Sequence, residues 1–483
     1  MVIGRELANF VTMNKEKNKR IQFFGGKSMD KIQLLQARKA KITEAGKGIR
    51  ADIASVVDEE SFLELSAFSF SKSEFYGENA EGEGVVTGYA TIDGYPFYIV
   101  AQNFAVLDGG VSKASCDKIV KCLDVADKNN VPVLYLLNTH GVQVGEGVTV
   151  LEGLSSVFLK ATQIKTNATP QYVIVNGDVF GAAAILAAIA NFTFFVNGKS
   201  VLAVNSPFVL SAKAGKNLTK EEVGGSKALD KTGLVSFEVA DLTEVREKII
   251  SLLGFFSNEM PDAELNDACP ALNEAVNVTN LLSIFDSYLE LCPSYEPEVK
   301  TVLGRIGGIS VAALIFDGEN GVELTTAKVE KAKALVDLAS YMDLPFLSFT
   351  DVKGICPCAC ANNSYVLKAT AEYLELFDML NTPKISVVYK QAIGLGYSLF
   401  AAKSVGFDYT YAFANAKIAL FDSVQGAQIE LGNTGVDKAA LVERYAEENS
   451  DPVNAAKGGF VDAIIEPQFV KQYLIATLQM LSV

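Results

Sequence analysis

The sequence repeats one pattern of glycines and prolines at a constant distance of 213 residues. Gly141 ends the apolar segment VPVLYLLNTHG, and Gly354 ends the matching segment LPFLSFTDVKG (354 − 141 = 213). The same offset relates three further positions: Pro132 to Pro345, Thr169-Pro170 to Thr382-Pro383, and Gly181 to Gly394. Because glycine and proline mark turns, their constant spacing indicates that a whole domain has been duplicated.

Length and apolar content agree with two domains. A chain of 483 residues with 49% hydrophobic content can bury two cores, each in a domain of roughly 200 residues. We expect an N-terminal helical segment at 1–46, a first domain at 47–256, a linker at 257–283 and a second domain at 284–483. In the helical segment, heptad-like spacing of apolar residues predicts amphipathic packing of Ile32, Leu34, Leu35 and Ile42.

Both halves alternate strand-like apolar segments with helical segments. This alternation predicts an α/β fold with a largely parallel sheet in each half. The expected elements include helices at Ser112–Asn129 and Thr326–Met342 and strands at Val131–Asn138, Tyr172–Asn176, Pro345–Phe349 and Ile385–Tyr389. The first of these helices should bury Ile119, Cys122 and Val125 on one face.

Charge and residue usage argue against several classes of function. The formal net charge of −15 makes nucleic acid an unfavourable partner. The N-terminus lacks the apolar core of a signal peptide, and the most apolar stretch, 181–196, is too short to span a membrane, so we expect a cytoplasmic protein. His140 is the only histidine, which leaves little room for imidazole acid–base catalysis.

Three cysteines, Cys356, Cys358 and Cys360, form a C-P-C-A-C run. Their spacing invites a metal or redox interpretation. No second Cys or His cluster lies nearby in the sequence to complete a tetrahedral site. We therefore expect no metal and favour an ordinary loop of small residues.

The turns after two expected strands are candidates for catalysis by backbone groups. One strand ends at Thr139-His140-Gly141-Val142, and the next ends at 177–182, which includes Gly181 and Ala182. Ligands of α/β domains gather at the carboxyl ends of strands, and glycine lets backbone N–H groups approach them closely. Two N–H groups that converge on one oxygen would form an oxyanion hole. Close packing of helix on strand would also explain these glycines, and the residues alone leave both interpretations open.

Several motifs in a fixed order resemble one enzyme family. They are GEGVVTGYATIDGYPFYIVAQNF, the pattern G-G-x-S-x-A at Gly109–Ala114, VPVLYLLNTHG, LPFLSFTDVKG, and KGGFVDAIIEP at Lys457–Pro467. In this order they resemble the carboxyltransferase subunit of biotin-dependent acyl-CoA carboxylases, to which subunits of sodium-pumping acyl-CoA decarboxylases are related. The resemblance implies two duplicated domains of the ClpP/crotonase-like fold, a β-β-α superhelix.

The resemblance also implies which residues act. The backbone N–H groups of Gly141 and Val142 would hold the thioester enolate of the acyl-CoA, and the turn with Gly181 and Ala182 would take part in binding. In the second half, Gly394, Leu395 and Gly396 would hold the urea oxygen of biotin. Among the departures from the family pattern, Phe180 replaces an alanine, Lys353 a proline, and Ser398 the residue that tunes acyl size.

The expected reaction moves a carboxyl group between carboxybiotin and the α-carbon of a short acyl-CoA, of the propionyl-CoA/methylmalonyl-CoA or acetyl-CoA/malonyl-CoA type. Since the chain lacks a biotin-accepting Met-Lys-Met segment, biotin would be attached to a separate biotin carboxyl carrier protein. A biotin carboxylase or a membrane decarboxylase subunit would be a further partner, and the chain would assemble with itself, from a dimer to a trimer of dimers. Two alternatives stay open: a methylmalonyl-CoA-type decarboxylase alpha subunit, and a non-catalytic structural or regulatory homologue.

Overall fold

The chain forms two compact units, Met1–Lys47 and Gly48–Val483. The structure, a computed structural model, describes residues 30–69, 81–257, 268–356, 365–431 and 438–481. The described part of the first unit contains helix α2 (Lys31–Ala45), in which Ile32, Leu34 and Leu35 are exposed. These three residues therefore do not form the buried face that their spacing predicted.

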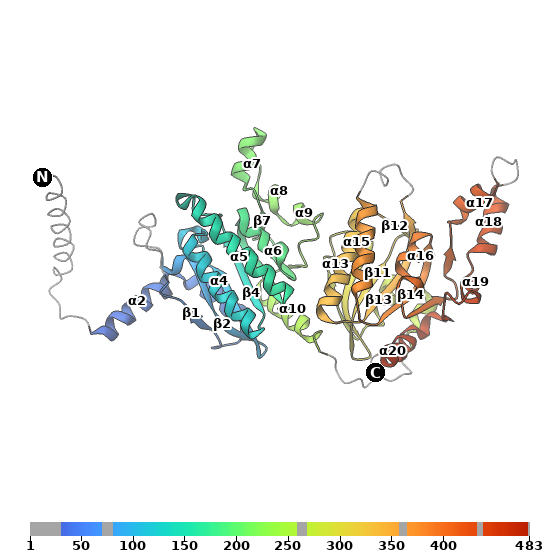
Figure 1. The fold of residues 1–483 in the computed structure, drawn as a ribbon, viewed down its shortest axis with the longest axis horizontal. Helices are drawn as coiled ribbons and strands as arrows, with labels where there is room; N and C mark the ends of the chain where they lie inside the picture. The colour runs from blue at the N-terminus through green and yellow to red at the C-terminus, as the bar shows by residue number, and fades with distance from the viewer. Residues whose placement is uncertain (1–29, 70–80, 258–267, 357–364, 432–437, 482–483) are drawn as a thin grey trace. The chain divides into compact units, whose positions relative to one another are not determined.

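The first β-sheet of the second unit has the strand order β1-β2-β3-β4-β5-β6-β8, with β7 paired to β5 (Figure 1). The pairings among β1, β2 and β3 are antiparallel, and all later pairings are parallel. Its strands are β1 (Leu63–Leu65), β2 (Val85–Ile92), β3 (Tyr95–Gln102), β4 (Val133–Thr139), β5 (Gln171–Phe180), β6 (Phe192–Val196), β7 (Val201–Ala203) and β8 (Phe237–Val239).

The second sheet repeats this arrangement, in the order β9-β10-β11-β13-β14-β15-β17. Here β16 pairs with β14 as β7 does with β5, and β12 pairs with β13. Its strands are β9 (Ser287–Leu291), β10 (Val299–Ile306), β11 (Ile309–Phe316), β12 (Val322–Leu324), β13 (Phe346–Ile355), β14 (Lys384–Ile393), β15 (Tyr409–Phe413), β16 (Lys417–Ala419) and β17 (Ala463–Ile465).

Helices connect the parallel strands, and short 3₁₀ helices (η) form several of the turns. The first half contains α3 (Lys47–Val56), η2 (Glu81–Gly84), η3 (Leu107–Gly109), α4 (Lys113–Asn129), η4 (Val144–Glu146), α5 (Val148–Thr166), η5 (Gly181–Ala184), α6 (Ile185–Ile189), α7 (Pro207–Ala214), α8 (Lys220–Gly224), α9 (Ser226–Leu229) and α10 (Leu242–Gly254). The second half contains α11 (Ala271–Glu274), α12 (Val278–Leu282), α13 (Thr326–Met342), α15 (Val366–Met379), α16 (Leu395–Phe400), η6 (Lys403–Val405), α17 (Ser423–Leu431), α18 (Lys438–Asn449), α19 (Pro452–Lys457), η7 (Pro467–Phe469) and α20 (Val470–Leu481).

The 213-residue repeat of the sequence is also a repeat of the structure. Helices α4 and α13 each have 17 residues and begin at the same offset (326 − 113 = 213). The hydroxyls of Ser112 and Thr325 accept hydrogen bonds from the first turns of these helices, and Asn130 and Asp343 end them in the left-handed conformation. Equivalent caps thus begin and end equivalent helices, as the repeat predicted.

Strand β4 buries apolar side chains on both of its faces. Val133, Tyr135 and Leu137 face a core formed with α4 and α5, which lie side by side along the sheet (Figure 1). Leu134 and Leu136 face the opposite core. Apolar residues without polar alternation are typical of a parallel strand covered on both sides.

The core on this opposite face continues into the second half of the chain. One cluster of buried side chains includes Tyr172 in β5, Ile249 in α10, Leu335 in α13 and Phe346 in β13. The two sheets therefore share one hydrophobic core. The other face of the second sheet forms a separate core with α20.

Helix α4 shows where apolar spacing alone misplaces a residue. Ile119 and Cys122 are buried, as predicted, but Val125 is 37% exposed. Ala126, the next residue, faces the core in its place. The buried stripe of the helix passes through position 126 because α4 lies flat on the sheet, and the prediction for Val125 is wrong.

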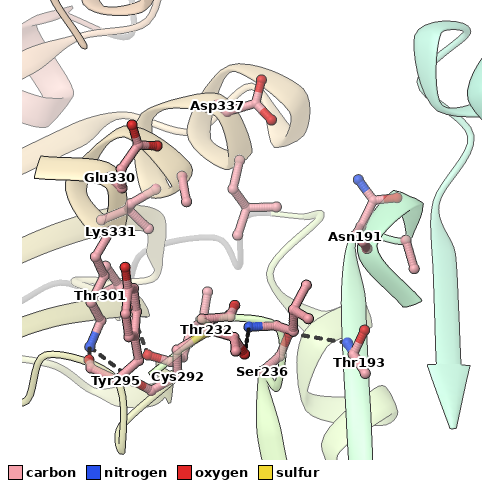
Figure 2. Close-up of a pocket in the computed structure, with 18 of the residues that line it drawn as sticks. Asn191, Thr193, Thr232, Ser236, Cys292, Tyr295, Thr301, Glu330, Lys331 and Asp337 are labelled. Carbon is pink, nitrogen blue, oxygen red and sulfur yellow. Dashed lines mark hydrogen bonds between the residues drawn. The ribbon is translucent and has the colours of Figure 1, made fainter. Parts of the chain in front are cut away.

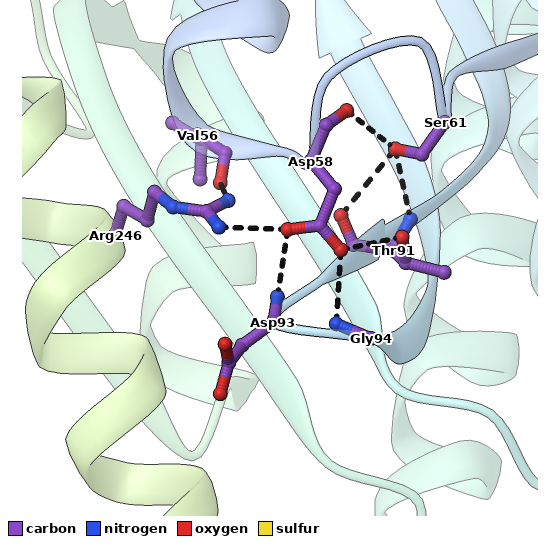
Figure 3. Close-up of polar contacts among 7 residues, drawn as sticks. All are labelled: Val56, Asp58, Ser61, Thr91, Asp93, Gly94 and Arg246. Atoms are coloured by element: carbon purple, nitrogen blue, oxygen red, sulfur yellow. Dashed lines mark hydrogen bonds and ion pairs between the residues drawn. The ribbon is translucent and has the colours of Figure 1, made fainter.

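The carboxylate of Asp58 joins the β2–β3 hairpin to α10 (Figure 3). It accepts hydrogen bonds from Thr91 Oγ1 (2.6 Å) and from the backbone N–H groups of Asp93 and Gly94 (2.9 Å each). Nη2 of Arg246 lies 2.7 Å from Asp58 Oδ1. Burial opposes ionisation of Asp58, but these four donors outweigh it and hold the pKa of the carboxyl well below its usual range.

Residues 268–283, in the second part of the predicted linker, include α11 and α12. Leu272 and Leu281 of these helices are buried in the core of the second half. The domain boundaries at 46, 256 and 283 stay predictions.

None of the described helices is both long and apolar enough to cross a membrane.

Candidate active site

The first candidate turn follows β4. Gly141 has a φ of 114°, and its N–H donates to Thr139 Oγ1 at 3.0 Å. Its carbonyl accepts from the N–H of Val111, and the carbonyl of Val111 accepts from the N–H of Gln143. Because N–H groups alternate in direction along an extended segment, the N–H of Val142 points away from Val111. Val142 is therefore a candidate donor, whereas the N–H of Gly141 is directed to a side chain of its own turn.

The second candidate turn follows β5. Gly181 has a φ of 78°, a conformation that favours glycine, and its N–H donates to the carbonyl of Val204 at 3.1 Å. Ala182 is the next residue in η5. Since the first N–H groups of a helix have no acceptor within it, Ala182 is a second candidate donor.

The two turns touch each other. A Cβ placed on Gly181 would lie 3.7 Å from Cα of Gly141, and one placed on Gly141 would lie 3.6 Å from the carbonyl oxygen of Phe180. The structure thus brings together Gly141, Val142, Gly181 and Ala182, which the sequence had placed in two separate turns. Phe180, which departs from the family pattern, is a buried side chain at the end of β5.

The second half builds the same junction. Gly354 and Gly394 have φ values of 94° and 54°, and the N–H of Gly394 donates to the carbonyl of Ala419 at 2.9 Å, as Gly181 does to Val204. A Cβ on Gly354 would lie 3.8 Å from the nitrogen of Leu395. A Cβ on Gly396 would lie only 2.6 Å from Cγ1 of Val352, so close packing requires glycine there.

Ile355 is a candidate that the sequence interpretation missed. It follows Gly354 as Val142 follows Gly141, at the same offset (355 − 142 = 213). Its partner in β12 is Leu324, and the bridge between Val111 and Val142 is the equivalent pairing in the first half. The repeat itself would have identified this backbone N–H group, had the offset been applied to Val142.

A polar pocket of about 370 Å³ lies at the carboxyl ends of β13 and β14. Its lining includes Ile393, directly before the Gly394 turn, and three lysines, Lys353, Lys390 and Lys417. Lys390 Nζ lies 3.0 Å from Asp317 Oδ1 and 3.2 Å from Oδ2 of the buried Asp351. Burial would lower the pKa of Lys390, but these two carboxylates outweigh it and raise that pKa above its ordinary value.

Another pocket, of about 330 Å³, lies between the two halves (Figure 2). Lys331 borders it but is itself buried, and its Nζ donates to the backbone carbonyls of Cys292 and Tyr295. Burial lowers the pKa of Lys331 to about 8. No residue of the candidate turns lines this pocket, so it belongs to the packing between halves rather than to the turn chemistry.

His140 reaches from the first turn to the strand that leads into the second. Its Nε2 lies 3.2 Å from Oδ2 of Asp178 in β5, and Lys220 of α8 pairs with the same oxygen. The imidazole packs edge-on against Phe104, with ring centroids 4.7 Å apart. Asp178 is 12% exposed, whereas His140 is 49% exposed, so the ring keeps an open side.

Among the described residues, no group of three or more His, Cys, Asp or Glu side chains is placed to hold a metal ion. Cys356 is a half-buried cysteine. Cys358 and Cys360 lie outside the described residues, and the interpretation of this run as an ordinary loop stays a prediction.

Comparison with known proteins identifies relatives of the whole chain. The Carboxyl transferase domain family matches residues 43–482. The methylmalonyl-CoA decarboxylase subunit alpha of Veillonella parvula is 28% identical over 490 residues, which cover 94% of this chain and 96% of the relative. The propionyl-CoA carboxylase carboxyltransferase subunit of Haloferax mediterranei is 27% identical over 497 residues, which cover 96% and 95% of the two chains.

The structural comparison agrees with the predicted fold. A crystal structure of transcarboxylase 12S superimposes with a TM-score of 0.85 at 23% identity, covering 95% of this chain and 97% of the other. The prediction of two duplicated crotonase-like domains in an α/β chain is confirmed. Together with the family match over 43–482, this shows that the chain belongs to the carboxyl transferase domain family and is a carboxyltransferase of the biotin-dependent carboxylase and decarboxylase class.

Proposed function

We propose that this chain transfers a carboxyl group between carboxybiotin, attached to a separate carrier protein, and the α-carbon of a short acyl-CoA. The observation that carries the proposal is the duplicated junction of glycine turns. In each half, two glycine turns lie against each other at the carboxyl ends of the central strands. Two substrates that each develop negative charge on an oxygen need two such places.

The first half would bind the acyl-CoA thioester. The N–H groups of Val142 and Ala182 would donate to the thioester oxygen as the α-carbon becomes an enolate. Gly141 and Gly181 would allow this approach, since their positive φ values fold the two turns against each other. Donation by Gly141 itself would require its N–H to leave Thr139 Oγ1.

The second half would hold the urea oxygen of biotin. Leu395 is the first residue of α16, so its N–H and that of Gly396 have no acceptor within the helix. Gly394 sets the turn, and Leu395 is half exposed, so the turn can be reached by a ligand. When bound, carboxybiotin supplies the carboxyl group and a ureido nitrogen that can exchange the α-proton.

Propionyl-CoA and methylmalonyl-CoA are the pair of substrates to test first, because the two relatives described above carry these names. Ser398 lies in the first turn of α16, with its hydroxyl 3.5 Å from the carbonyl of Gly394. Its side chain is exposed close to the Gly394 turn, which supports a place for it in the lining of the site. The Veillonella relative favours the decarboxylase alpha subunit as the alternative, in which the same transfer runs from the acyl-CoA to biotin.

A second copy of this chain would complete the site. Each half leaves large apolar side chains exposed just beyond the strand that pairs with its second turn: Val204 and Phe208 after β7, and Leu420 and Val424 after β16. Phe208 is 84% exposed and Leu420 71%, so both favour burial by a partner. Transcarboxylase 12S, whose chain has the same fold, forms a hexamer assembly, which supports self-association of this chain.

Transfer of ¹⁴C from carboxyl-labelled methylmalonyl-CoA to free biotin tests the proposal. Leu395→Pro removes one N–H donor, and proline is tolerated at the first position of a helix. We expect exchange to fall about a hundredfold to a thousandfold, with Leu395→Ala as the matched control that keeps the donor. Binding of CoA thioesters without any exchange by the wild-type protein would favour the non-catalytic alternative and contradict the proposal.

A further inference from the structure

Two positions beside the turns carry chemically different residues in the two halves of the chain. His140 and Asp178 correspond, at the offset of 213, to Lys353 and Gln391. His140 contacts Asp178 in the first half, whereas Gln391 Nε2 donates instead to Asp351 at 3.0 Å in the second. A contact that the fold itself required would occur in both halves. The imidazole–carboxylate pair therefore points to a role that the first half does not share with the second.

The pair is held on several sides. Asp178 is largely buried and contacts both His140 Nε2 and Lys220 Nζ. The backbone N–H of His140 lies 3.3 Å from the carbonyl of Asp108 in η3, and Phe104 packs against the ring. Among the described residues, Lys220 is the further charged side chain that forms an ion pair with this imidazole–carboxylate pair.

The imidazole can offer a hydrogen-bond donor to an anion. Lys220 compensates the charge of Asp178, so the Asp178 carboxylate does not repel an anion that approaches the exposed side of the ring. A carboxylate accepts a hydrogen bond from a ring N–H, whereas an acyl chain without that group has no acceptor at this place.

We propose that His140, positioned by Asp178, is a specificity residue that binds the α-carboxylate of a dicarboxylic acyl-CoA, such as methylmalonyl-CoA, in preference to the acyl-CoA without that group. This inference rests on the proposed binding of acyl-CoA by the first half. His140 directly precedes Gly141 and contacts Asp178 of β5, the strand that leads into the Gly181 turn. The exposed side of its ring would therefore be available to a carboxylate on the α-carbon of a thioester held by the two turns.

The test is calorimetric binding of methylmalonyl-CoA and propionyl-CoA to the full chain and to its His140→Ala variant. The CoA part is common to both ligands, so its contacts cancel in the ratio of the two dissociation constants. We expect His140→Ala to lower the preference for methylmalonyl-CoA about fivefold, as for the loss of a half-exposed polar contact to a charged group, with propionyl-CoA affinity retained. His140→Gln keeps an N–H donor and should lose less of the preference.

Asp178→Asn is a further variant. Without the carboxylate, the imidazole loses the contact that positions it, so the preference for methylmalonyl-CoA should fall while propionyl-CoA affinity is retained. A wild-type protein that shows no preference for methylmalonyl-CoA overturns the inference, and so does a His140→Ala protein that keeps the wild-type ratio. If neither thioester binds the wild-type protein, the proposed function fails first and this inference fails with it.

Discussion

Replacement of Asp58 should lower the free energy of unfolding by an amount that can be estimated from the hydrogen bonds of its carboxylate. The carboxylate accepts from Thr91, Asp93, Gly94 and Arg246, all at 2.6–2.9 Å (Figure 3). Hydrogen bonds to a charged group stabilise by about 1.5–3 kcal/mol each when buried. The side chain is 26% exposed, so the released donors regain water and the sum must be reduced. We expect Asp58→Ala to lose about 2–4 kcal/mol and Asp58→Asn about half of that.

The effect should depend on pH in a defined direction. The pKa of Asp58 lies below its ordinary value of 3.8 in the folded protein. Such a group contributes its full stabilisation above the unfolded pKa and loses it as the pH falls toward the folded pKa. The difference in stability between wild type and Asp58→Asn should therefore be constant from pH 7 to about pH 5 and shrink below pH 4.

Urea unfolding followed by far-UV circular dichroism is the appropriate measurement, because the chain has no tryptophan. Asp117→Asn is the control: it removes an exposed carboxylate that pairs with Lys113 one turn earlier in α4, and such pairs contribute about 0.3–0.5 kcal/mol. If Asp58→Asn unfolds at the same urea concentration as the control at pH 7, the reasoning is refuted. A difference that grows between pH 5 and pH 3 would refute it equally.

Further substitutions test contacts between elements and the proposed contact between copies of the chain. Gly396→Ala should cost about 1–3 kcal/mol in urea unfolding, since its Cβ would overlap Val352, and Val352→Ala in the same chain should recover part of the loss. Lys331→Met removes the donor that the carbonyls of Cys292 and Tyr295 share, while the carbonyl of Cys292 keeps the N–H of Tyr295, and the substitution should cost about 1–2 kcal/mol. Because the pKa of Lys331 is lowered to about 8, the unfolded chain binds more protons at this residue above that pH, so the difference in stability between wild type and Lys331→Met should shift toward the wild type from pH 8 to 10. Phe208→Glu should shift the protein toward smaller species in sedimentation velocity, whereas an unchanged distribution would remove α7 from the proposed interface.

Helices α4 and α13 could be predicted almost to the residue, because their limits are set locally. Ser112 and Thr325 supply the N-terminal caps, and Asn130 and Asp343 follow the last helical turn. These signals lie in the sequence next to the helix and need no knowledge of the rest of the fold.

Strand β5 extends beyond its predicted end because it pairs with a strand that follows later in the chain. Tyr172–Asn176 was expected, but β5 continues to Phe180, because its last residues pair with β7 about twenty residues further along the chain. The register of β4 against β5 also shifts near Leu137, which lets the extended segment turn toward the site. The apolar pattern of β5 does not reveal this pairing, because β7 lies after the turn that follows β5.

The residues of the candidate site also fall into two groups: those that the local sequence identifies and those that only distant contacts identify. Gly141 and Gly181 could be located from the repeat, because their positive φ values favour glycine and the glycines are visible in the sequence. The contact of His140 with Asp178 was not anticipated, although both lie at the carboxyl ends of neighbouring strands. Lys220 could not have been assigned, because it returns to Asp178 from α8 across several intervening elements.

The shared hydrophobic core restricts how the duplicated halves can evolve. Tyr172 of the first half and Phe346 of the second belong to one buried cluster. A recombination event that exchanged only one half with a relative would bring together two surfaces selected against different neighbours, leaving voids or overlaps at the seam. Viable chimeras should therefore inherit both sides of that seam from one parent. In this chain, each half completes the hydrophobic core of the other.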